Sequence, residues 1–296
     1  MSKVIDLLTP NYNYYPYVRK TLFPVIVQAG VGGTGSNLVP QIAQMLTSFG
    51  DKAMYVLADG DQVEEKNLKN QLYVSTNIGK SKADILAKRY RAAYNINIGC
   101  FNEYIEDLRT LRNLFSTDYV NIGGTYREHV VILPILISCV DNNFSRQLFH
   151  EFFESVPTLL YIDVGNESAV VPKDFMQRPK DKWTKEEIEA YNESGWTGQV
   201  VAGLKRNGKT ILEPVASLYP DILEDQDTIK PSTVSCEQIV SSDPQRLLTN
   251  KTAALAVLNY LYELMECGTI SKHKTVFHAK KGYMQSVPLP EETPTY

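Results

Sequence analysis

Short glycine-rich and polar motifs follow one another through the first half of the chain. The first is the turn from Gly30 to Ser36, which comes directly after the apolar run 25–29. Glycines let the backbone bend sharply and bring its N–H groups against phosphate oxygens, at the positive end of the following helix. The candidate phosphate-binding residues in this turn are Gly30, Gly32, Gly33, Gly35 and Ser36. A tight strand-to-helix turn without a ligand is the alternative, because an isolated glycine motif is weak evidence.

Polar residues after the next apolar run, 54–58, extend the predicted site. Asp59 ends this run and is placed to accept hydrogen bonds from ribose hydroxyls. Asn67, Gln71 and Lys82 come later and can reach back over phosphates. A dinucleotide cofactor would leave these three residues without a shared function, so their presence favours a triphosphate ligand. Taken alone, Lys82 is better explained as an exposed residue at the start of a helix.

Asp141 is the candidate magnesium ligand. It follows the apolar run 130–140, and Mg²⁺ is commonly held by one or two carboxylates together with phosphate oxygens. Capping of the next helix is the alternative role for Asp141, with Asn142 beside it, and the other motifs favour the metal. Cys139, inside the run, is interpreted as a small buried residue rather than a nucleophile.

The elements that must position these residues alternate between strands and helices. The apolar patterns predict strands over 25–29, 54–58, 98–105, 130–140 and 159–164, and helices after the glycine turn and over 82–94 and 144–153. Such alternation predicts a Rossmann-like α/β fold with a doubly wound, mainly parallel sheet. Ligands bind such sheets at the carboxyl ends of the strands, where these polar residues occur.

The second half of the chain differs in character. Residues 172–195 are polar, contain Trp183 and are followed directly by Trp196, and they predict a surface excursion with a short helix at 185–191. The following pattern predicts strands at 199–204 and 210–212, joined by an Asn207-Gly208 turn. A loop over 219–235 then leads to Cys236. After it we expect a helix over 249–266 and a hairpin of 274–277 with 283–286. The fold therefore ends with a helix plus strands.

Composition excludes several classes of protein. The chain has 296 residues, of which 43% are hydrophobic, and a net charge of −4, so a nucleic-acid-binding protein is not expected. Its four cysteines are far apart in sequence, which argues against a zinc knuckle or a disulfide framework. No apolar stretch approaches the roughly 20 residues that span a bilayer, and the first residues lack a signal-peptide core. We therefore expect a soluble cytoplasmic protein without membrane partners.

The ordered motifs resemble those of the ThiF/MoeB/ubiquitin-activating superfamily of adenylyltransferases. They read G-x-G-G-x-G-S, D-x-D-x-V-x-x-x-N-L-x-x-Q, G-x-x-K and D-N-x-x-x-R. The second half resembles the ThiF-related protein of bacterial PRTRC cassettes at Gly198-Gln199-Val200-Val201, Leu218-Tyr219-Pro220, Ser235-Cys236-Glu237 and Asn250. The resemblance implies an adenylation domain over 22–290, with an insertion and crossover loop at 166–235, an N-terminal arm at 1–21 and a tail at 291–296.

This resemblance implies ATP- and Mg²⁺-dependent adenylation of the C-terminal glycine of a ubiquitin-like protein. It also implies a homodimer, a conjugating enzyme as a further partner, and thioester formation on Cys236 as a second step. The residues implied to bind the nucleotide are the glycine turn with Ser36, Asp59, Asp61 and Asn142; those implied to contact phosphates are Asn67, Gln71 and Lys82, with Asp141 on magnesium. Asp141 and Cys236 are thus the implied catalytic residues.

The chain departs from the family pattern in three places. Asn70 stands where the superfamily usually has an arginine, so a phosphate-binding cation is missing. The paired zinc cysteines of ThiF and MoeB are absent, so zinc is not expected. Arg19 is the N-terminal arginine nearest to the first strand, but its spacing does not match the arginine that many relatives supply from a partner subunit.

Two other functional classes stay open. The first is a catalytically weak or silent ThiF-like subunit, which the replacement at Asn70 favours. The second is an NAD(P)-dependent oxidoreductase, which would use the glycine turn and Asp59 but would leave Lys82 and Asp141 without a shared role.

Overall fold

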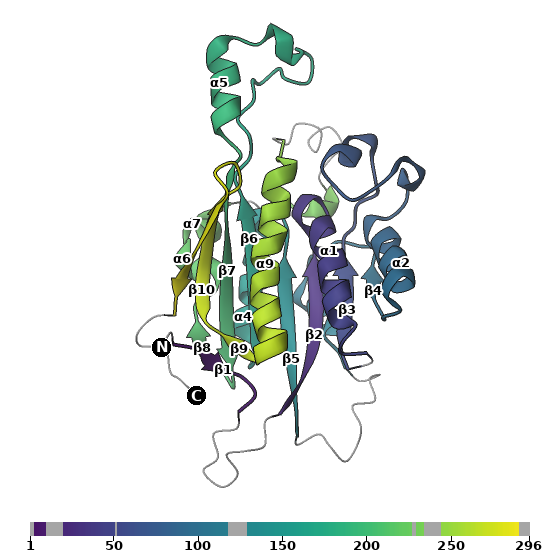
Figure 1. The fold of residues 1–296 in the computed structure, drawn as a ribbon, viewed down its shortest axis with the longest axis vertical. Coiled ribbons are helices and arrows are strands. Elements are labelled where there is room, and N and C mark those ends of the chain that lie inside the picture. The colour runs from purple at the N-terminus through teal and green to yellow at the C-terminus, as the bar shows by residue number, and fades with distance from the viewer. Residues whose placement is uncertain are drawn as a thin grey trace.

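A nine-stranded sheet forms the centre of the structure (Figure 1). The structure is a computed structural model and describes residues 3–9, 20–50, 52–117, 129–226, 229–233 and 244–289. The strands are β2 (Thr21–Ala29), β3 (Met54–Ala58), β4 (Gly99–Phe101), β5 (Val130–Ser138), β6 (Leu159–Asn166), β7 (Thr197–Arg206), β8 (Lys209–Leu212), β10 (Lys272–His278) and β11 (Tyr283–Pro288). The strand order is β11-β10-β7-β6-β5-β2-β3-β4, with β8 paired to β7. A separate short ladder joins β1 (Ile5–Asp6) to β9 (Thr269–Ile270).

The five neighbouring strands β4, β3, β2, β5 and β6 are parallel to one another. The sheet continues in antiparallel pairs through β7, β10 and β11. Both faces of the parallel part are buried, which is why its strands are almost continuously apolar. In β6, for example, Leu160 and Ile162 pack into one core cluster while Leu159 and Tyr161 pack into the other. The Rossmann-like, mainly parallel fold predicted from the sequence is confirmed.

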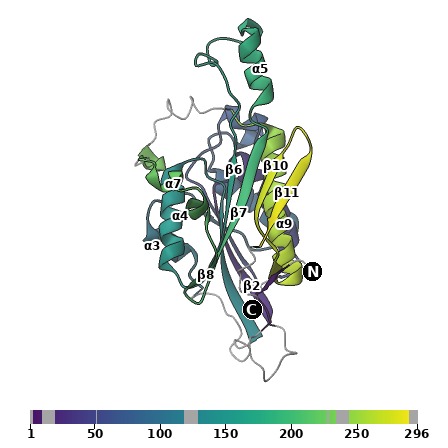
Figure 2. The same cartoon turned by 90° about the vertical axis from the view of Figure 1, so that its left-hand side faces the viewer.

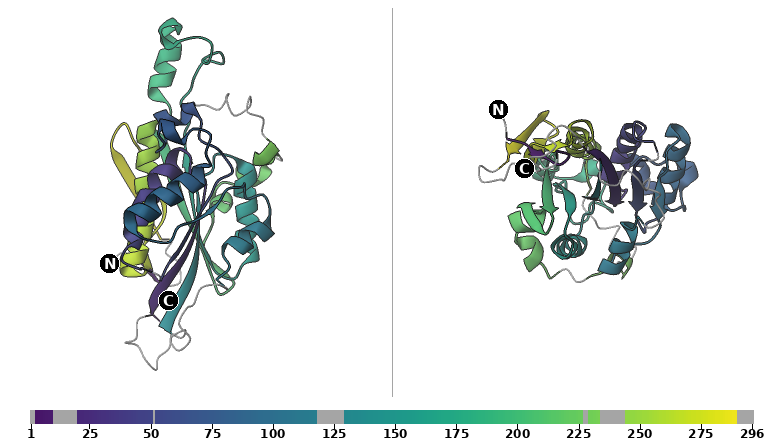
Figure 3. Two further views of the ribbon diagram at one scale, coloured as in Figure 1. Left: turned by 90° about the vertical axis from the view of Figure 1, so that its right-hand side faces the viewer. Right: turned by 90° about the horizontal axis from the view of Figure 1, so that it is seen from below.

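Helices cover both faces of the sheet (Figures 2 and 3). One face carries α1 (Gly33–Leu46), α2 (Lys82–Tyr94) and α9 (Leu247–Cys267). The other face carries α3 (Leu108–Leu114), α4 (Asn143–Ser155), α6 (Val215–Leu218) and α7 (Asp221–Glu224). Short 3-10 turns occur at η1 (Glu65–Lys69), η2 (Ser75–Asn77), η4 (Lys180–Lys182) and η5 (Pro231–Thr233). This layering places the carboxyl ends of the parallel strands at one edge of the sheet.

The predicted third strand is shorter than expected. We expected a strand over 98–105, and β4 covers only Gly99–Phe101. After β4 the chain leaves the sheet, and the Tyr104 hydroxyl donates a hydrogen bond to Asp61. Asp107 then accepts a hydrogen bond from the Thr110 N–H and begins α3, which the sequence analysis did not predict.

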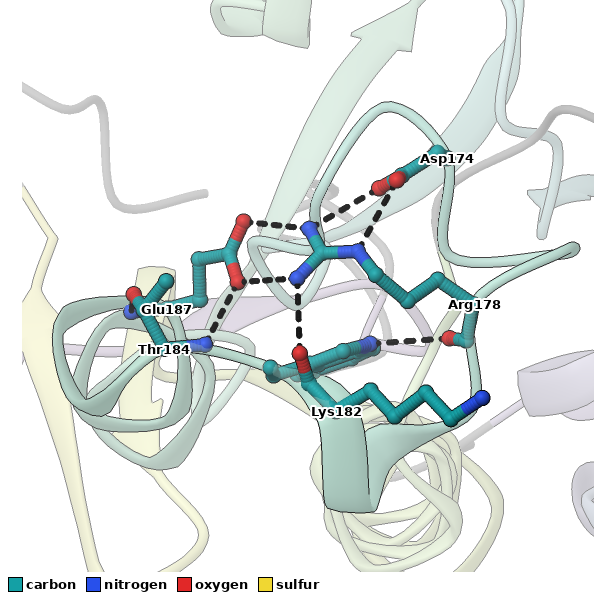
Figure 4. Close-up of polar contacts among 6 residues, drawn as sticks. Asp174, Arg178, Lys182, Thr184 and Glu187 are labelled. Carbon is teal, nitrogen blue, oxygen red and sulfur yellow. Dashed lines mark hydrogen bonds and ion pairs between the residues drawn. The ribbon is translucent and has the colours of Figure 1, made fainter.

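The predicted surface excursion projects from the body as an arm, which we define as residues 167–196 and which contains α5 (Lys185–Glu193) (Figure 1). Within it, the Arg178 guanidinium lies between two carboxylates (Figure 4). Arg178 Nε is 2.8 Å from Asp174 Oδ2, and Nη1 is 2.8 Å from Glu187 Oε2. This bidentate pairing holds the loop before α5 against the helix.

Candidate nucleotide-binding site

The glycine turn joins β2 to α1, and two of its glycines are required by close contacts within the protein. Gly30 has φ +86°, and a Cβ there would lie 2.8 Å from the Cys139 carbonyl oxygen. A Cβ at Gly35 would lie 2.1 Å from the Gly30 carbonyl oxygen. These two glycines therefore serve the tight strand-to-helix turn, whether or not a ligand binds.

The turn is open at Gly32. A Cβ at Gly32 would meet only Gln71, with Nε2 at 3.8 Å. Gly32 is also the N-cap of α1, and this 14-residue helix has neither a side-chain cap nor an acidic residue in its first turn. By contrast, Ser81 caps α2 and Asn142 caps α4. The first turn of α1 therefore has no side-chain cap of its own, which leaves its N–H groups available to an anion.

Asp59 organises the backbone around this turn. Its Oδ2 accepts a hydrogen bond from the Val31 N–H and its Oδ1 accepts one from the Asp61 N–H, each at 2.8 Å. Burial raises the pKa of the Asp59 carboxyl, and the charge of Asp61 adds to this effect while Lys82 opposes it. Each carboxylate oxygen retains a second lone pair, so Asp59 can also accept a hydrogen bond from a ribose hydroxyl.

Lys82 is paired with Asp61 rather than directed at solvent. Its Nζ lies 2.7 Å from Asp61 Oδ2, and the lysine side chain is only 6% exposed. Although burial acts in the other direction, Lys82 lowers the pKa of the Asp61 carboxyl, as does the hydrogen bond that Tyr104 donates to it. The alternative that Lys82 is simply an exposed residue at a helix start is excluded. The Lys82 ammonium pairs with Asp61, whose N–H donates to Asp59, and Asp59 in turn accepts a hydrogen bond from Val31 in the glycine turn.

Hydrogen bonds made by the two residues after Gln71 hold this part of the chain over the glycine turn. The Leu72 N–H donates to Ser36 Oγ at 3.1 Å, and the Tyr73 hydroxyl donates to the Val31 carbonyl oxygen at 2.7 Å. Gln71 Oε1 is buried without a hydrogen-bond partner among the described residues. Buried polar atoms without partners are rare in native proteins.

Asn67 and Asn142 are used within the protein. Asn67 is 6% exposed, and its Oδ1 accepts a hydrogen bond from the Glu64 N–H at the start of η1. Asn142 Oδ1 accepts one from the Ser145 N–H at 2.8 Å and so caps α4. Their oxygens therefore have structural partners, which leaves their amide N–H groups as the donors that could serve a nucleotide.

Asp141 follows β5 and is exposed. The described residues donate no hydrogen bond to its carboxylate, and the cap of α4 is its neighbour Asn142. Among the described residues, no group of three or more His, Cys, Asp or Glu side chains forms a metal site. A magnesium ion held by Asp141 would therefore need phosphate oxygens or water for most of its ligands, which is its usual coordination in nucleotide sites.

A buried charge network beside the site was not anticipated. Arg146 Nε lies 3.3 Å from Asp163 Oδ2, and Arg146 also donates to the Val140 carbonyl oxygen at 2.8 Å. Ser138 Oγ donates to Asp163 at 2.6 Å. Burial opposes the charge of Arg146, but Asp163 raises the pKa of the guanidinium overall. The arginine of the D-N-x-x-x-R motif was the available signal, and its role here is to tie α4 to the ends of β5 and β6.

Cys139 is half-buried, whereas the sequence analysis expected a buried residue. Burial raises the pKa of its thiol, with Asp163 adding to the effect and Arg146 opposing it, and a protonated thiol is a poor nucleophile. The predicted nucleophile, Cys236, lies outside the described residues. The structure thus brings together the glycine turn, Asp59, Asp61, Gln71 and Lys82 at one edge of the sheet, with Asp141 after the neighbouring strand.

Comparisons with known proteins agree with this geometry. Residues 21–154, which include the glycine turn, Asp59, Lys82 and Asp141, match the model of the ThiF family. No curated protein matches the sequence. Within the described residues, no helix is long and apolar enough to cross a membrane.

Solved structures with similar folds include the microcin C7 biosynthetic enzyme MccB. MccB in complex with N-formylated MccA has a TM-score of 0.53 at 15% identity, over 89% of this chain and 64% of that chain. Escherichia coli MccB with ATP has a TM-score of 0.51 at 17% identity, over 89% of this chain and 62% of that chain. This chain therefore spans less than two thirds of the length of these structures. At such identities the likeness shows a shared Rossmann-like fold.

Proposed function

We propose that this protein is an adenylyltransferase that uses ATP and Mg²⁺ to activate the C-terminal glycine of a ubiquitin-like protein. The observation that carries the proposal is the uncapped positive end of α1, which is open at Gly32 and faced by the Nε2 donor of Gln71. The match of residues 21–154 to the ThiF family supports the reaction class. MccB, whose fold is similar, has been solved with ATP and with the peptide MccA.

The residues of the site have separable roles in this reaction. A carboxylate oxygen of the substrate attacks the α-phosphorus of ATP, the bond from this phosphorus to the oxygen bridging the β-phosphate breaks, and pyrophosphate leaves. In-line attack of this kind needs positioning and charge neutralisation more than a base. The first turn of α1 and Gln71 hold the phosphates, and Asp59 holds the ribose. Asp141 would hold Mg²⁺, which supplies positive charge to the phosphates.

The ion pair between Lys82 and Asp61 is the contact that we expect to change when ATP binds. In the structure the lysine charge is offset by Asp61 at 2.7 Å. A triphosphate carries more negative charge than one carboxylate, so it competes for the same ammonium group. The proposal therefore assigns Lys82 to the phosphates once ATP is bound, with Tyr104 retaining its hydrogen bond to Asp61.

We extend the proposal to a thioester step on Cys236. Its thiolate attacks the carbonyl carbon of the acyl-adenylate and AMP leaves, with the thiol proton passing to solvent. Cys236→Ala should still make adenylate but lose any reductant-sensitive adduct with the ubiquitin-like partner, whereas Ala substitutions of Cys100, Cys139 and Cys267 should keep it. An adduct that persists in Cys236→Ala would contradict the step, and no adduct in the wild type would indicate direct transfer from the adenylate.

A thermal-shift comparison of ATP with NAD tests the nucleotide assignment. A ligand at 100 times its Kd stabilises the native state by about 2.7 kcal/mol. We expect ATP with Mg²⁺ to raise the melting temperature and NAD to leave it unchanged. Stabilisation by NAD alone would favour the oxidoreductase alternative. ATP binding without adenylation would favour a silent subunit, which the absence of an arginine at Asn70 supports.

The resemblance to the ThiF-related protein of bacterial PRTRC cassettes leads to a proposal about the substrate. A ubiquitin-like protein ending in glycine and encoded beside this chain would be its acceptor, with a conjugating enzyme as a later partner. Inspection of neighbouring genes tests this directly, and the absence of any such small protein would count against the ubiquitin-like assignment.

A further inference from the structure

The arm is a much longer connection than its two flanking strands need. β6 and β7 are antiparallel neighbours, and Asn166 pairs with Gly198 where they meet the arm. Neighbours of this kind can be joined by a hairpin loop of about two to five residues. Residues 167–196 separate them instead, and form η4 and α5. Connections much longer than the strands require are usually functional, so the arm needs an explanation that the sheet does not supply.

Side chains from the start of α9 fix the base of the arm to the body. Arg246 Nε donates to the Ser194 carbonyl oxygen at 2.8 Å, and the guanidinium lies 3.9 Å from the centre of the Trp196 ring. Thr249 Oγ1 donates to the Gly195 carbonyl oxygen at 2.6 Å. These contacts hold the arm in one direction relative to the sheet.

The arm leaves the body beside the glycine turn (Figure 1). β6 is parallel to β5, which is parallel to β2, so β6 and β2 end at the same edge of the sheet. Asn166, the last residue of β6, donates from Nδ2 to Thr34 Oγ1 at 2.8 Å, and Thr34 lies in the first turn of α1. A protein bound to the arm is therefore held next to the proposed nucleotide site.

A pocket of 260 Å³ lies on the arm, between α5 and the segment 170–172. It is smaller than the roughly 300–1,000 Å³ of small-molecule sites, so it suits one or two side chains of a protein better than a cofactor. Val170 in its wall is 54% exposed. The lining consists of Val170, Val171, Pro172, Glu186, Glu187 and Ala190.

The charged residues in this lining are both glutamates. Glu187 is compensated, because it forms an ion pair with Arg178 (Figure 4). Glu186 is exposed and forms no ion pair with the residues that the structure describes. An occupant with a positive charge beside its apolar side chain would therefore complement the pocket, and a guanidinium could bind the Glu186 carboxylate through two parallel hydrogen bonds.

We propose that the arm is the docking site for a separate partner protein, which places an apolar side chain in this pocket and an adjacent arginine or lysine on Glu186. The arm contains none of the residues proposed to contact ATP or Mg²⁺, so the inference does not rest on the adenylation reaction. Docking on the arm holds the partner at the edge of the sheet where the glycine turn lies.

A calorimetric titration of the full chain with a peptide tests the docking site. The probe is acetyl-Ser-Arg-Leu-Arg-Ser-amide, which has no free carboxylate and so cannot be adenylated. We expect saturable binding at up to millimolar peptide. Replacing the leucine by serine should weaken binding at least about tenfold, because the apolar side chain that fills the pocket is lost.

Filling the pocket from the protein side should have the same effect. Ala190→Phe should weaken binding of the leucine peptide at least about tenfold. Asn192→Phe is the matched control, because Asn192 is an exposed residue of α5 that does not line the pocket. Both tryptophans of the chain, Trp183 and Trp196, lie in the arm, so the emission spectrum of each variant shows whether the arm is still folded.

The charge contact is tested by pairing a protein variant with a peptide variant. Glu186→Gln should weaken binding about threefold, as expected for an exposed ion pair. Glu189→Gln is the control, because Glu189 is exposed on the same helix outside the pocket. In Glu186→Gln, a peptide with glutamine in place of both arginines should bind as tightly as the parent peptide, a coupling that general loss of structure would not produce.

Each contrary result overturns a stated part of the inference. No binding at millimolar peptide overturns the docking site, and unchanged affinity in Ala190→Phe overturns the pocket. Equal losses in Glu186→Gln and Glu189→Gln overturn the charge contact. A fall in the light-scattering mass in Ala190→Phe but not in Asn192→Phe would assign the pocket to a second copy of this chain and overturn the separate partner. None of these measurements uses ATP, so a chain that fails to bind ATP would contradict the proposed function and leave the docking site standing.

Discussion

At the scale of single residues, the account depends most on Asp141. Its carboxylate is exposed, follows β5, and receives no hydrogen bond from the described residues. We expect Asp141→Ala to lower pyrophosphate exchange at least about a hundredfold, comparable to the loss of a principal electrostatic stabiliser. Folding should be unaffected, because Asn142 and not Asp141 caps α4. Full exchange activity in Asp141→Ala would remove the magnesium assignment.

Asn70 offers a gain-of-function prediction. It ends η1, one residue before Gln71, where the superfamily resemblance leads one to expect arginine. If a missing cation limits catalysis, Asn70→Arg should raise the exchange rate, with Lys69→Arg as a control for added guanidinium at an exposed neighbour. An unchanged rate in Asn70→Arg would mean that another cation, such as Lys82, already fills this role.

The sequence predicted the identity of the site residues better than their partners. Asp59, Gln71 and Lys82 do gather near the glycine turn, because strand ends in a doubly wound sheet share one edge. The pairing of Lys82 with Asp61 was not predictable from spacing, since it depends on how the backbone turns after β3. The hydrogen bond between the Asn166 and Asn250 side chains was equally unpredictable, because the two residues are 84 positions apart in the sequence.

At the scale of elements, Arg146 ties α4 to the sheet through Asp163, which is 3% exposed. Arg146→Met should destabilise the fold by about 3–5 kcal/mol, because it leaves a buried carboxylate without its cation. Urea unfolding of Arg146→Met, with Arg146→Met/Asp163→Asn as a partial rescue, measures this effect. Arg178→Met is a control from the exposed arm (Figure 4) and should lose much less. Equal losses at Arg146 and Arg178 would contradict the assigned role.

Element positions were predictable where the local signals were strong. The helix expected over 82–94 begins and ends as α2 does, because Ser81 caps it and Asn95 adopts φ +52° at its end. The first strand was predicted from residue 25, whereas β2 begins at Thr21. Pro24 obscured this extension. It is tolerated because β3 pairs with β2 only from Val25 onward, so at Pro24 the strand has a neighbour on one side only.

At the scale of the whole molecule, exposed residues of α9 define a candidate surface for the homodimer that the family resemblance implies. Four leucines recur at helical spacing along α9, namely Leu255, Leu258, Leu261 and Leu264. Leu261 and Leu264 lie in the core, whereas Leu248, Leu255 and Tyr262 form an exposed stripe with 50%, 49% and 57% exposure.

We expect light scattering at micromolar concentration to give twice the monomer mass of 33.4 kDa. Leu255→Lys should shift the protein towards monomer, and Leu223→Lys, at an exposed leucine of α7, should not. Only the monomer mass in the wild type would contradict the dimer. A dimer insensitive to Leu255→Lys would place the interface elsewhere.

The central claim is that this chain breaks the bond between the α- and β-phosphates of ATP when a carboxylate is presented to it. Exchange of labelled pyrophosphate into ATP measures this step directly, because label enters ATP only if that bond breaks and re-forms. With a pool of peptides that end in a free glycine carboxylate, we predict exchange that requires both peptide and Mg²⁺. Stabilisation by ATP without any peptide-dependent exchange would contradict the claim.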